Sequence, residues 1–488
     1  MGLWSNNRRE KNLSSDNIKI SIALLLAALM VRLIGLKSMP EIQADEGLWT
    51  ICTKNFLWSG NWLNDQSTHF LLSPVFHLLS LIGFYCWGPS IFAARLLSAL
   101  AGAGSTYLLF RIILALDHRK DVALIAAMFF GFSASTVTMS RLALIEATQL
   151  FFVLLALYLL IINISWRTIV SGLVMGIALL TKINSGIFIG IVCFFILFNN
   201  HVGEANKNIK LSKIALKKGT LFIVVSCGIG LLVYWALFLH FREQFMPAFK
   251  YEIDGVHFEA ISKPIVRLGR FGIEPSRISQ TILALFHGTP YLMVLSTIGL
   301  VFGLRKLRQG AILFAPWCIA GTAFFLFQMY QPLKYFYLVA PAYAYFAAIP
   351  IIVLTDNQKK RRTIILVLMS IMMCFEVGHL VMVSRGEKVK QVHQWVISNT
   401  NRYEKIMAAS YLCIDYQNPS YAFYKFARSE NELLENIKKL DIDYVIYDSG
   451  EWPDSLGNAL KSHFLRVQHW KFGDVYQIKH TALPQTDP

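Results

Sequence analysis

Charged side chains are scarce in this chain of 488 residues. Asp, Glu, Lys and Arg make up only 16% of it, whereas 55% of the residues are hydrophobic. A soluble domain carries about 25% charged residues. The shortage excludes an ordinary soluble enzyme and predicts a membrane protein with many spanning segments.

Several sequence patterns are also missing. There is no glycine-rich phosphate loop, so nucleotide binding has no support. The seven cysteines match neither the spacing of a metal site nor a disulfide framework, and only Cys52 and Cys413 are expected to contact water. The net charge of +16 arises from short basic clusters between apolar segments, which indicate topology signals rather than a nucleic-acid partner.

Apolar segments of about 20 residues are needed to cross a bilayer, and the chain holds about eleven candidates. They are residues 19–36, 89–116, 121–140, 146–163, 167–182, 186–199, 219–240, 288–304, 311–329, 333–354 and 362–383. Arg32 near the end of the first segment and Lys37 after it stand where a cleavage site would need small residues, so an uncleaved span is expected.

Residues 70–88 are also apolar, but Ser73, Pro74 and His77 favour a helix along the outer surface. With this stretch outside, the basic clusters all face the cytoplasm. The predicted protein is therefore an integral protein of the plasma (inner) membrane. It has a cytoplasmic tail (1–18), a transmembrane domain (19–385) and an extracytoplasmic domain (386–488).

The last hundred residues have a different pattern. Residues 388–397 and 430–440 predict helices, and 405–410 and 443–448 predict strands, which together suggest a small α/β domain. Its acids and histidines match no catalytic or metal motif, and they are interpreted as surface residues: Asp441, Asp443, Asp448, His463 and His469.

Acids and bases converge on the predicted outer face. Asp45 and Glu46 lie in the first outer loop (37–88), and we interpret Asp45 as a catalytic base. The alternative is that this pair only caps a short helix at 47–58. Other ionisable residues predicted at this face or at the outer ends of spans are Arg95, Arg141, Glu146, Lys182, Lys334 and Glu376. Such groups in spans usually face a polar chamber, although for Arg32 alone snorkelling to the interface is favoured.

The outer loop 241–287 is too long for a simple connection. It contains His257 among several charged residues and is interpreted as a lid or binding loop, with disorder as the alternative.

Six pieces of sequence together resemble a known family. They are Asp45-Glu46, Ser73 to His77, Phe92 to Gly102, Ser140 to Glu146, Leu180 to Lys182, and Lys334-Tyr335. In this order and spacing they resemble the GT-C glycosyltransferases. The similarity is to bacterial relatives of protein O-mannosyltransferase and of the lipid A aminoarabinose transferase, which are families 39 and 83.

The resemblance implies a GT-C-like helical membrane fold and an inverting transfer. A sugar would move from a polyprenyl-phosphate donor to a hydroxyl of an acceptor protein, lipid or glycan on the outer side, with membrane lipids as further partners. Asp45 would be the general base, and Glu46 and Glu146 would be secondary acids or would position the acceptor. Groups that would stabilise the leaving phosphate are Arg95, Arg141, Lys182, Lys334 and Tyr335.

Two departures from the family pattern affect the phosphate contacts. The chain has Leu72-Ser73-Pro74 where the family has a basic residue, so that contact is either lost or supplied by His69. It has Lys334-Tyr335 in place of Arg-Tyr, and lysine lacks the bidentate fork of arginine. His257 and Glu376 are further candidates. No cofactor is required, although Asp45 and Glu146 could together hold Mg²⁺ or Mn²⁺.

Two other functions compete with the transferase. One is a transporter or flippase of lipid-linked sugars, which would place polar sites near the membrane midplane, often in two related halves. Here the midplane is poor in charge and no repeat is visible. The other is a scaffolding subunit whose outer domain binds a partner.

Overall fold

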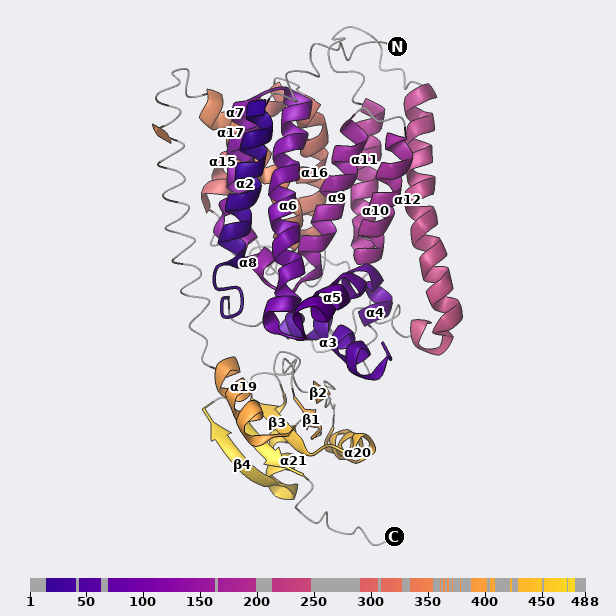
Figure 1. Ribbon diagram of the computed structural model, residues 1–488, viewed down its shortest axis with the longest axis vertical. Coiled ribbons are helices and arrows are strands. Elements are labelled where there is room, and N and C mark those ends of the chain that lie inside the picture. The colour runs from indigo at the N-terminus through magenta and orange to yellow at the C-terminus, as the bar shows by residue number, and fades with distance from the viewer. Residues whose placement is uncertain are drawn as a thin grey trace, which may run out of the picture. The chain divides into compact units, whose positions relative to one another are not determined.

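The computed structural model is mostly helical (Figure 1). It describes residues 15–40, 44–62, 69–162, 166–198, 213–246, 290–305, 309–326, 334–353, 388–401, 404–408, 422–423, 429–449, 452–471 and 473–478, with isolated helical residues between 360 and 378. The chain divides into two compact units. The first is formed by residues 1–36, 71–76 and 98–382, and the second by 37–70, 77–97 and 383–488. The predicted domain boundaries stay a prediction.

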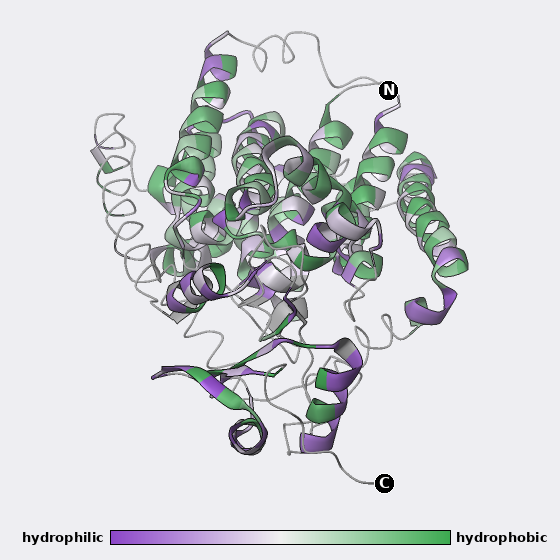
Figure 2. Ribbon diagram, turned by 60° about the horizontal axis from the view of Figure 1, so that its bottom comes forward, coloured by the Kyte–Doolittle hydropathy of each residue, from purple (hydrophilic) through white to green (hydrophobic). Residues whose placement is uncertain are grey.

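The first unit is built from long apolar helices. They are α2 (Ser15–Leu33), most of α6 (Ile91–Asp117), α7 (Lys120–Phe132), α8 (Ala134–Arg141), α9 (Ile145–Ile161), α10 (Arg167–Thr181), α11 (Gly186–Phe198), α12 (Lys213–His240), α15 (Pro290–Arg305), α16 (Gln309–Leu326) and α17 (Lys334–Val353). A 3₁₀ turn, η1 (Ile183–Ser185), joins α10 to α11. These helices lie at the predicted segments up to residue 354, whereas the predicted segment 362–383 lies mostly outside the described residues. Figure 2 shows that the helices are largely hydrophobic.

Among the described residues, three helices are long and apolar enough to cross a membrane: α6, α12 and α17. The pair α7 and α8, bent by 55° at Ser133, could form a fourth span. The other apolar helices in the described ranges are shorter, so the count of about eleven spans stays a prediction. The helices still indicate an integral membrane protein.

Helix α17 is the centre of the first unit. It packs against α15, α7, α16 and α9, and its residues from Lys334 to Ile352 are buried. Pro341 and Pro350 lie inside it, as membrane helices tolerate when neighbouring helices surround them. Helix α12 is different, since Leu231, Leu232 and other large apolar side chains on it are exposed, as expected for contact with lipid.

An aspartate joins three of these helices. Asp117 ends α6, accepts a hydrogen bond from Gly310 N at the start of α16 (2.9 Å), and accepts another from the Tyr345 hydroxyl of α17 (2.7 Å). The carboxylate thereby satisfies one of the free N–H groups that begin a helix.

Two buried arginines join α2 to the break between α7 and α8. Arg32 Nη1 donates to Gly131 O (2.9 Å), and Arg32 Nε donates to Ser140 Oγ (2.8 Å). Arg141 donates to Val31 O and Ile34 O at the end of α2, both at 2.6 Å. Each guanidinium thus satisfies carbonyls that a helix end leaves open. The snorkelling interpretation of Arg32 is wrong, because its side chain is fully buried.

The second unit begins with short helices. They are α3 (Ala44–Ser59), α4 (His69–Leu72), α5 (Pro74–Trp87) and the first residues of α6, although α4 and α5 contribute residues to both units. Cys52 is buried in α3, so its expected exposure to water is wrong. Cys86 is the exposed cysteine of α5, and Cys413 lies outside the described residues.

The C-terminal residues form a five-stranded sheet with the order β2-β1-β3-β5-β4. Its strands are β1 (Ile406–Met407), β2 (Ala422–Phe423), β3 (Tyr444–Asp448), β4 (Leu465–Trp470) and β5 (Gly473–Gln477), with β2, β1 and β3 parallel and β5 antiparallel to β3 and β4. The helices of this region are α19 (Lys388–Asn399), α20 (Glu430–Leu440) and α21 (Asp454–His463). The predicted helix 430–440 is confirmed, and Ser429 caps it by accepting from Glu432 N.

Two aspartates of the sheet region were predicted at the surface and are buried instead. Asp443 is 9% exposed and Asp448 is 1% exposed. Asp443 Oδ2 accepts a hydrogen bond from Lys405 N (2.7 Å), which ties β3 to the segment before β1. These carboxylates therefore belong to the packing of the sheet and do not form a charged docking surface.

Candidate functional site

The first unit holds a buried ion pair between two sequence-predicted site residues. Lys182 Nζ lies 2.7 Å from Glu146 Oε1, and their side chains are 9% and 2% exposed. Glu146 is in the first turn of α9, where the helix dipole favours a carboxylate. Lys182 directly follows α10, in extended backbone.

The same ammonium group faces an aromatic ring from α17. Lys182 Nζ lies 4.8 Å from the centre of the Tyr335 ring, and Lys334 Nζ lies 5.9 Å from it. Lys334 is buried and opens α17, where the helix dipole disfavours a cation. Lys182 and Lys334 are therefore held near the N-terminus of α17, which carries a partial positive charge, with the carboxylate of Glu146 beside Lys182. Such an arrangement favours an anion.

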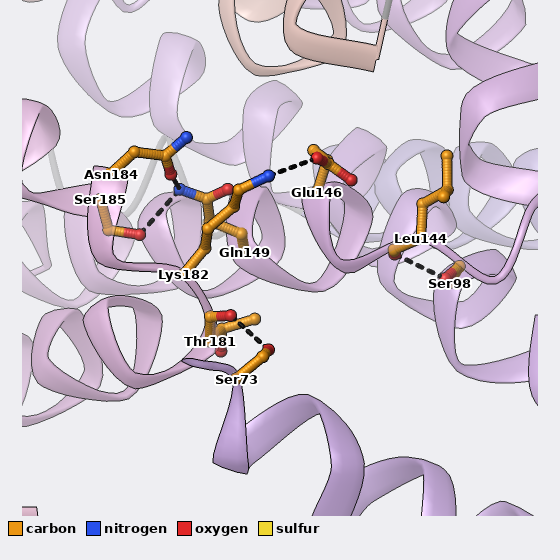
Figure 3. Close-up of polar contacts among 9 residues, drawn as sticks. All are labelled: Ser73, Ser98, Leu144, Glu146, Gln149, Thr181, Lys182, Asn184 and Ser185. Atoms are coloured by element: carbon orange, nitrogen blue, oxygen red, sulfur yellow. Dashed lines mark hydrogen bonds and ion pairs between the residues drawn. The ribbon is translucent and has the colours of Figure 1, made fainter. Parts of the chain in front are cut away.

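Polar contacts fix the turn that carries Lys182 (Figure 3). Ser73 Oγ donates to Thr181 O, and Ser185 Oγ donates to Ala178 O (2.8 Å). On the other side of the turn, Gln149 of α9 directs its amide toward η1. Its Nε2 donates to Asn184 Oδ1 (2.6 Å) and to Ser185 Oγ (2.8 Å). Lys182 is thus presented by a turn that is bonded before and after it.

The second unit holds the other acidic pair. Glu46 is 2% exposed and accepts two hydrogen bonds from Arg95, from Nε (2.8 Å) and from Nη2 (2.7 Å). Arg95 Nη1 also donates to Pro40 O (2.9 Å). This bidentate pairing fixes the first turn of α3, where the preceding residue, Asp45, is half-buried.

An aromatic cluster surrounds α3 within the same unit. The ring of Trp62 stacks on Phe56 and on Phe70, with centroids 4.0 and 4.2 Å apart. Trp49 meets the edge of His69 at 4.9 Å, and Thr53 Oγ1 lies 2.9 Å from His77 Nδ1. His69 is therefore held by Trp49, and its role at a phosphate stays a prediction.

The chain is similar to known proteins in part of its sequence and in its fold. Residues 67–243 match the family model described as dolichyl-phosphate-mannose-protein mannosyltransferase. The apo crystal structure of ArnT from Cupriavidus metallidurans is similar, with a TM-score of 0.67 and 14% identity, over 96% of this chain and 100% of that chain. The chain has the GT-C glycosyltransferase fold.

Two further structures support the GT-C fold. ArnT bound to undecaprenyl phosphate has a TM-score of 0.65 and 14% identity, and covers 93% of this chain and 97% of that chain. The archaeal oligosaccharyltransferase AglB from Archaeoglobus fulgidus, in complex with an inhibitory peptide and a dolichol-phosphate, has a TM-score of 0.55 and 13% identity, over 97% of this chain and 75% of that chain. No curated protein matches the chain by sequence. The resemblance to GT-C proteins is confirmed, and the transporter alternative is not favoured.

Within the GT-C fold the predicted site residues separate into groups. Glu146, Lys182, Lys334 and Tyr335 form one cluster in the first unit, and Glu46 with Arg95 forms a pair in the second. Arg141 donates to backbone carbonyls at the end of α2, and its role at a phosphate stays a prediction. His257 and Glu376 lie outside the described residues.

A metal bound by Asp45 and Glu146 was predicted as a possibility. No group of three or more His, Cys, Asp or Glu side chains gathers in the described ranges. Glu146 Oε1 is already paired with Lys182. Mg²⁺ and Mn²⁺ prefer several oxygen ligands. Asp45 and Glu146 belong to different units, so their joint binding of a metal stays a prediction.

Sequence reasoning missed Gln149 and Asn184. Both are uncharged, and the search for ionisable residues in apolar segments passed over them. One signal was present, since Gln149 follows Glu146 by three residues and therefore lies on the same face of α9. A buried amide in an apolar helix is costly unless it is hydrogen-bonded.

Proposed function

We propose that the protein is a glycosyltransferase that moves a sugar from a polyprenyl-phosphate donor to an acceptor hydroxyl on the extracytoplasmic side of the membrane. The observation that carries the proposal is the buried cluster in which Lys182 and Lys334 both face Tyr335, in a chain with the GT-C fold. The fold alone would leave the chemistry open.

The cluster suits the leaving group of this reaction. As the new bond to C1 of the sugar forms, the bond from C1 to the phosphate oxygen breaks, and negative charge grows on the departing polyprenyl phosphate. Buried ammonium groups stabilise such charge far better than exposed ones do. Lys182 and Lys334 would bind the phosphate, and Glu146 would hold Lys182 in place.

Asp45 is the proposed base. A hydroxyl is a weak nucleophile, so a carboxylate must accept its proton while the bond to C1 forms. One displacement at C1 inverts the configuration there. Asp45 would take this proton, since its neighbour Glu46 is already bound to Arg95 and would serve to fix the first turn of α3. The capping interpretation is compatible with this role, because both acids lie in the first turn of α3.

The neighbours' ligands support the proposed substrates. One ArnT structure contains undecaprenyl phosphate, and the AglB structure contains a dolichol-phosphate and an inhibitory peptide. We infer a polyprenyl phosphate for this chain from the same fold together with the Lys–Tyr–Lys cluster. The acceptor is a hydroxyl of a protein, lipid or glycan.

The test uses the purified protein reconstituted in liposomes with a panel of polyprenyl-phosphate sugars and a cell-envelope extract as acceptor. Release of free polyprenyl phosphate is followed for the wild type, for Asp45→Asn and for Asp16→Asn, which makes the same change at an exposed position of α2. We expect release by the wild type and Asp16→Asn but not by Asp45→Asn. Turnover by Asp45→Asn would remove Asp45 from the mechanism, and no release with any donor would contradict the transferase.

A further inference from the structure

Helix α9 carries three buried side-chain oxygens without a partner in the described part of the chain. One is the Thr148 hydroxyl, which can donate as well as accept, and the other two can only accept. These two are Glu146 Oε2 and Gln149 Oε1. Glu146 is 1% exposed and Gln149 is 0% exposed. A buried acceptor that makes no hydrogen bond is costly, and native proteins keep few of them, so each one calls for an explanation.

The two oxygens are held on one face of the helix. Residues three apart on a helix are neighbours on its surface. Glu146 is fixed through its other oxygen, which pairs with Lys182. Gln149 is fixed through Nε2, which donates to Asn184 and Ser185 (Figure 3).

The orientation of the Gln149 amide follows from its neighbour. Ser185 Oγ gives its proton to Ala178 O, so it can only accept from Gln149. Nitrogen must therefore face Ser185, and the oxygen is the atom left without a partner. Both open groups are acceptors, so the missing ligand supplies hydrogen-bond donors.

The charge nearby indicates which donors fit. The carboxylate of Glu146 is balanced by Lys182, so the pair offers little attraction to a second cation. Neutral hydroxyl groups satisfy two acceptors without adding charge. The ligand class that the geometry favours is therefore a polyhydroxylated one.

We propose that Glu146 Oε2 and Gln149 Oε1 accept hydrogen bonds from hydroxyls of the donor sugar. This inference rests on the proposed function. If Lys182 binds the donor phosphate, the sugar lies beside Lys182, because it is bonded directly to that phosphate. Glu146 is paired with Lys182, so it is within reach of the sugar. Gln149 then determines specificity, because a site built to bond a hydroxyl rejects an analogue that lacks it.

The test compares the binding of two kinds of lipid to the reconstituted protein. One is undecaprenyl phosphate without sugar, and the other is undecaprenyl phosphate carrying mannose, glucose or arabinose. For the sugar that the wild type binds best, Gln149→Met should weaken binding about tenfold, which is the loss of one hydrogen bond of about 1.4 kcal/mol. Binding of the bare lipid should change less than about twofold.

Asn184→Ala is the matched control, since it removes one partner of Gln149 Nε2 and leaves Oε1 in place. It should keep the preference for the sugar lipid. Equal losses of both lipids in Gln149→Met would mean that Gln149 only holds the Lys182 turn, and unchanged binding of both would mean that a water fills the site. Either result overturns the subsite.

A second measurement needs no variant. The wild type is given deoxy forms of its preferred sugar lipid, each lacking one hydroxyl. One or two of them should bind about tenfold more weakly than the parent. Uniform binding of all forms, or equal binding of sugar-bearing and bare lipid, overturns the subsite while leaving the transferase standing. A wild type that binds neither lipid contradicts the proposed function itself.

Discussion

Removing one member of the Glu46–Arg95 pair should destabilise the protein more than removing both. The two side chains are 3% and 0% exposed and are joined by two hydrogen bonds. Glu46→Met or Arg95→Met leaves the other charge buried without its partner, which costs about 3–5 kcal/mol of unfolding free energy.

The double variant leaves no buried charge at this place. It loses the hydrogen bond that Arg95 donates to Pro40 O, which lowers the free energy of unfolding by about 1–3 kcal/mol. The double variant should therefore be more stable than either single variant, with a coupling free energy of about 3 kcal/mol or more.

The free energy of unfolding would be measured by titrating the four proteins from a mild into a denaturing detergent. A double variant whose loss equals the sum of the two single losses, within about 0.5 kcal/mol, would refute the reasoning. Transfer activity adds a second readout. If the Glu46–Arg95 pair positions Asp45, the double variant should be more stable than the single variants but should transfer the sugar more slowly than the wild type.

Three other predictions follow from the same structure. Gly310→Ala should lower the melting temperature, because a Cβ there would lie 2.7 Å from the Tyr345 hydroxyl, and overpacking costs about 1–3 kcal/mol; an unchanged melting temperature would contradict this. Lys334→Gln should weaken binding of bare polyprenyl phosphate about tenfold or more, measured in liposomes, whereas equal binding would remove Lys334 from the phosphate site. In a variant lacking Cys86 and Cys413, a cysteine replacing exposed Asn61 should react with an impermeant label from outside, and one replacing exposed Lys120 should react only from the cytoplasm; the reverse pattern would refute the topology.

The sequence was sufficient for the parts of the fold that depend on local pattern. Apolar runs predicted where the helices of the first unit lie, because a helix in lipid must present apolar side chains. The helix 430–440 was predicted with its bounds from its residue pattern. The structure adds the reason for the bounds, since Ser429 caps the start and Asp441 takes a left-handed conformation at the end.

The environment of single charges was harder to predict. Arg32 was expected to reach toward water, yet it bonds Gly131 and Ser140 of other helices. Such contacts join residues more than ninety positions apart, and the composition around Arg32 carries no trace of them. The break at Ser133 that exposes the Gly131 carbonyl is what gives Arg32 a buried partner.

The candidate site was predicted in its ionisable members only. Glu146, Lys182, Lys334 and Tyr335 were all singled out from the sequence, and the structure brings them together. That Glu146 and Lys182 neutralise each other was not foreseen, because Glu146 lies in α9 and Lys182 lies 36 residues later, after the end of α10. Gln149 was missed because a neutral amide gives no electrostatic signal in an apolar sequence.

The burial of α17 has a consequence for how the protein is made. This helix is the last long described helix of the first unit to leave the ribosome, yet α7, α9, α15 and α16 all pack on it. Until about residue 353 has been inserted, those helices must wait in the membrane with their inner faces covered by lipid or by an insertion factor. Chains that stop before α17 should therefore be recognised as incomplete and degraded, whereas chains that stop after it already hold the core that the described helices of the first unit form.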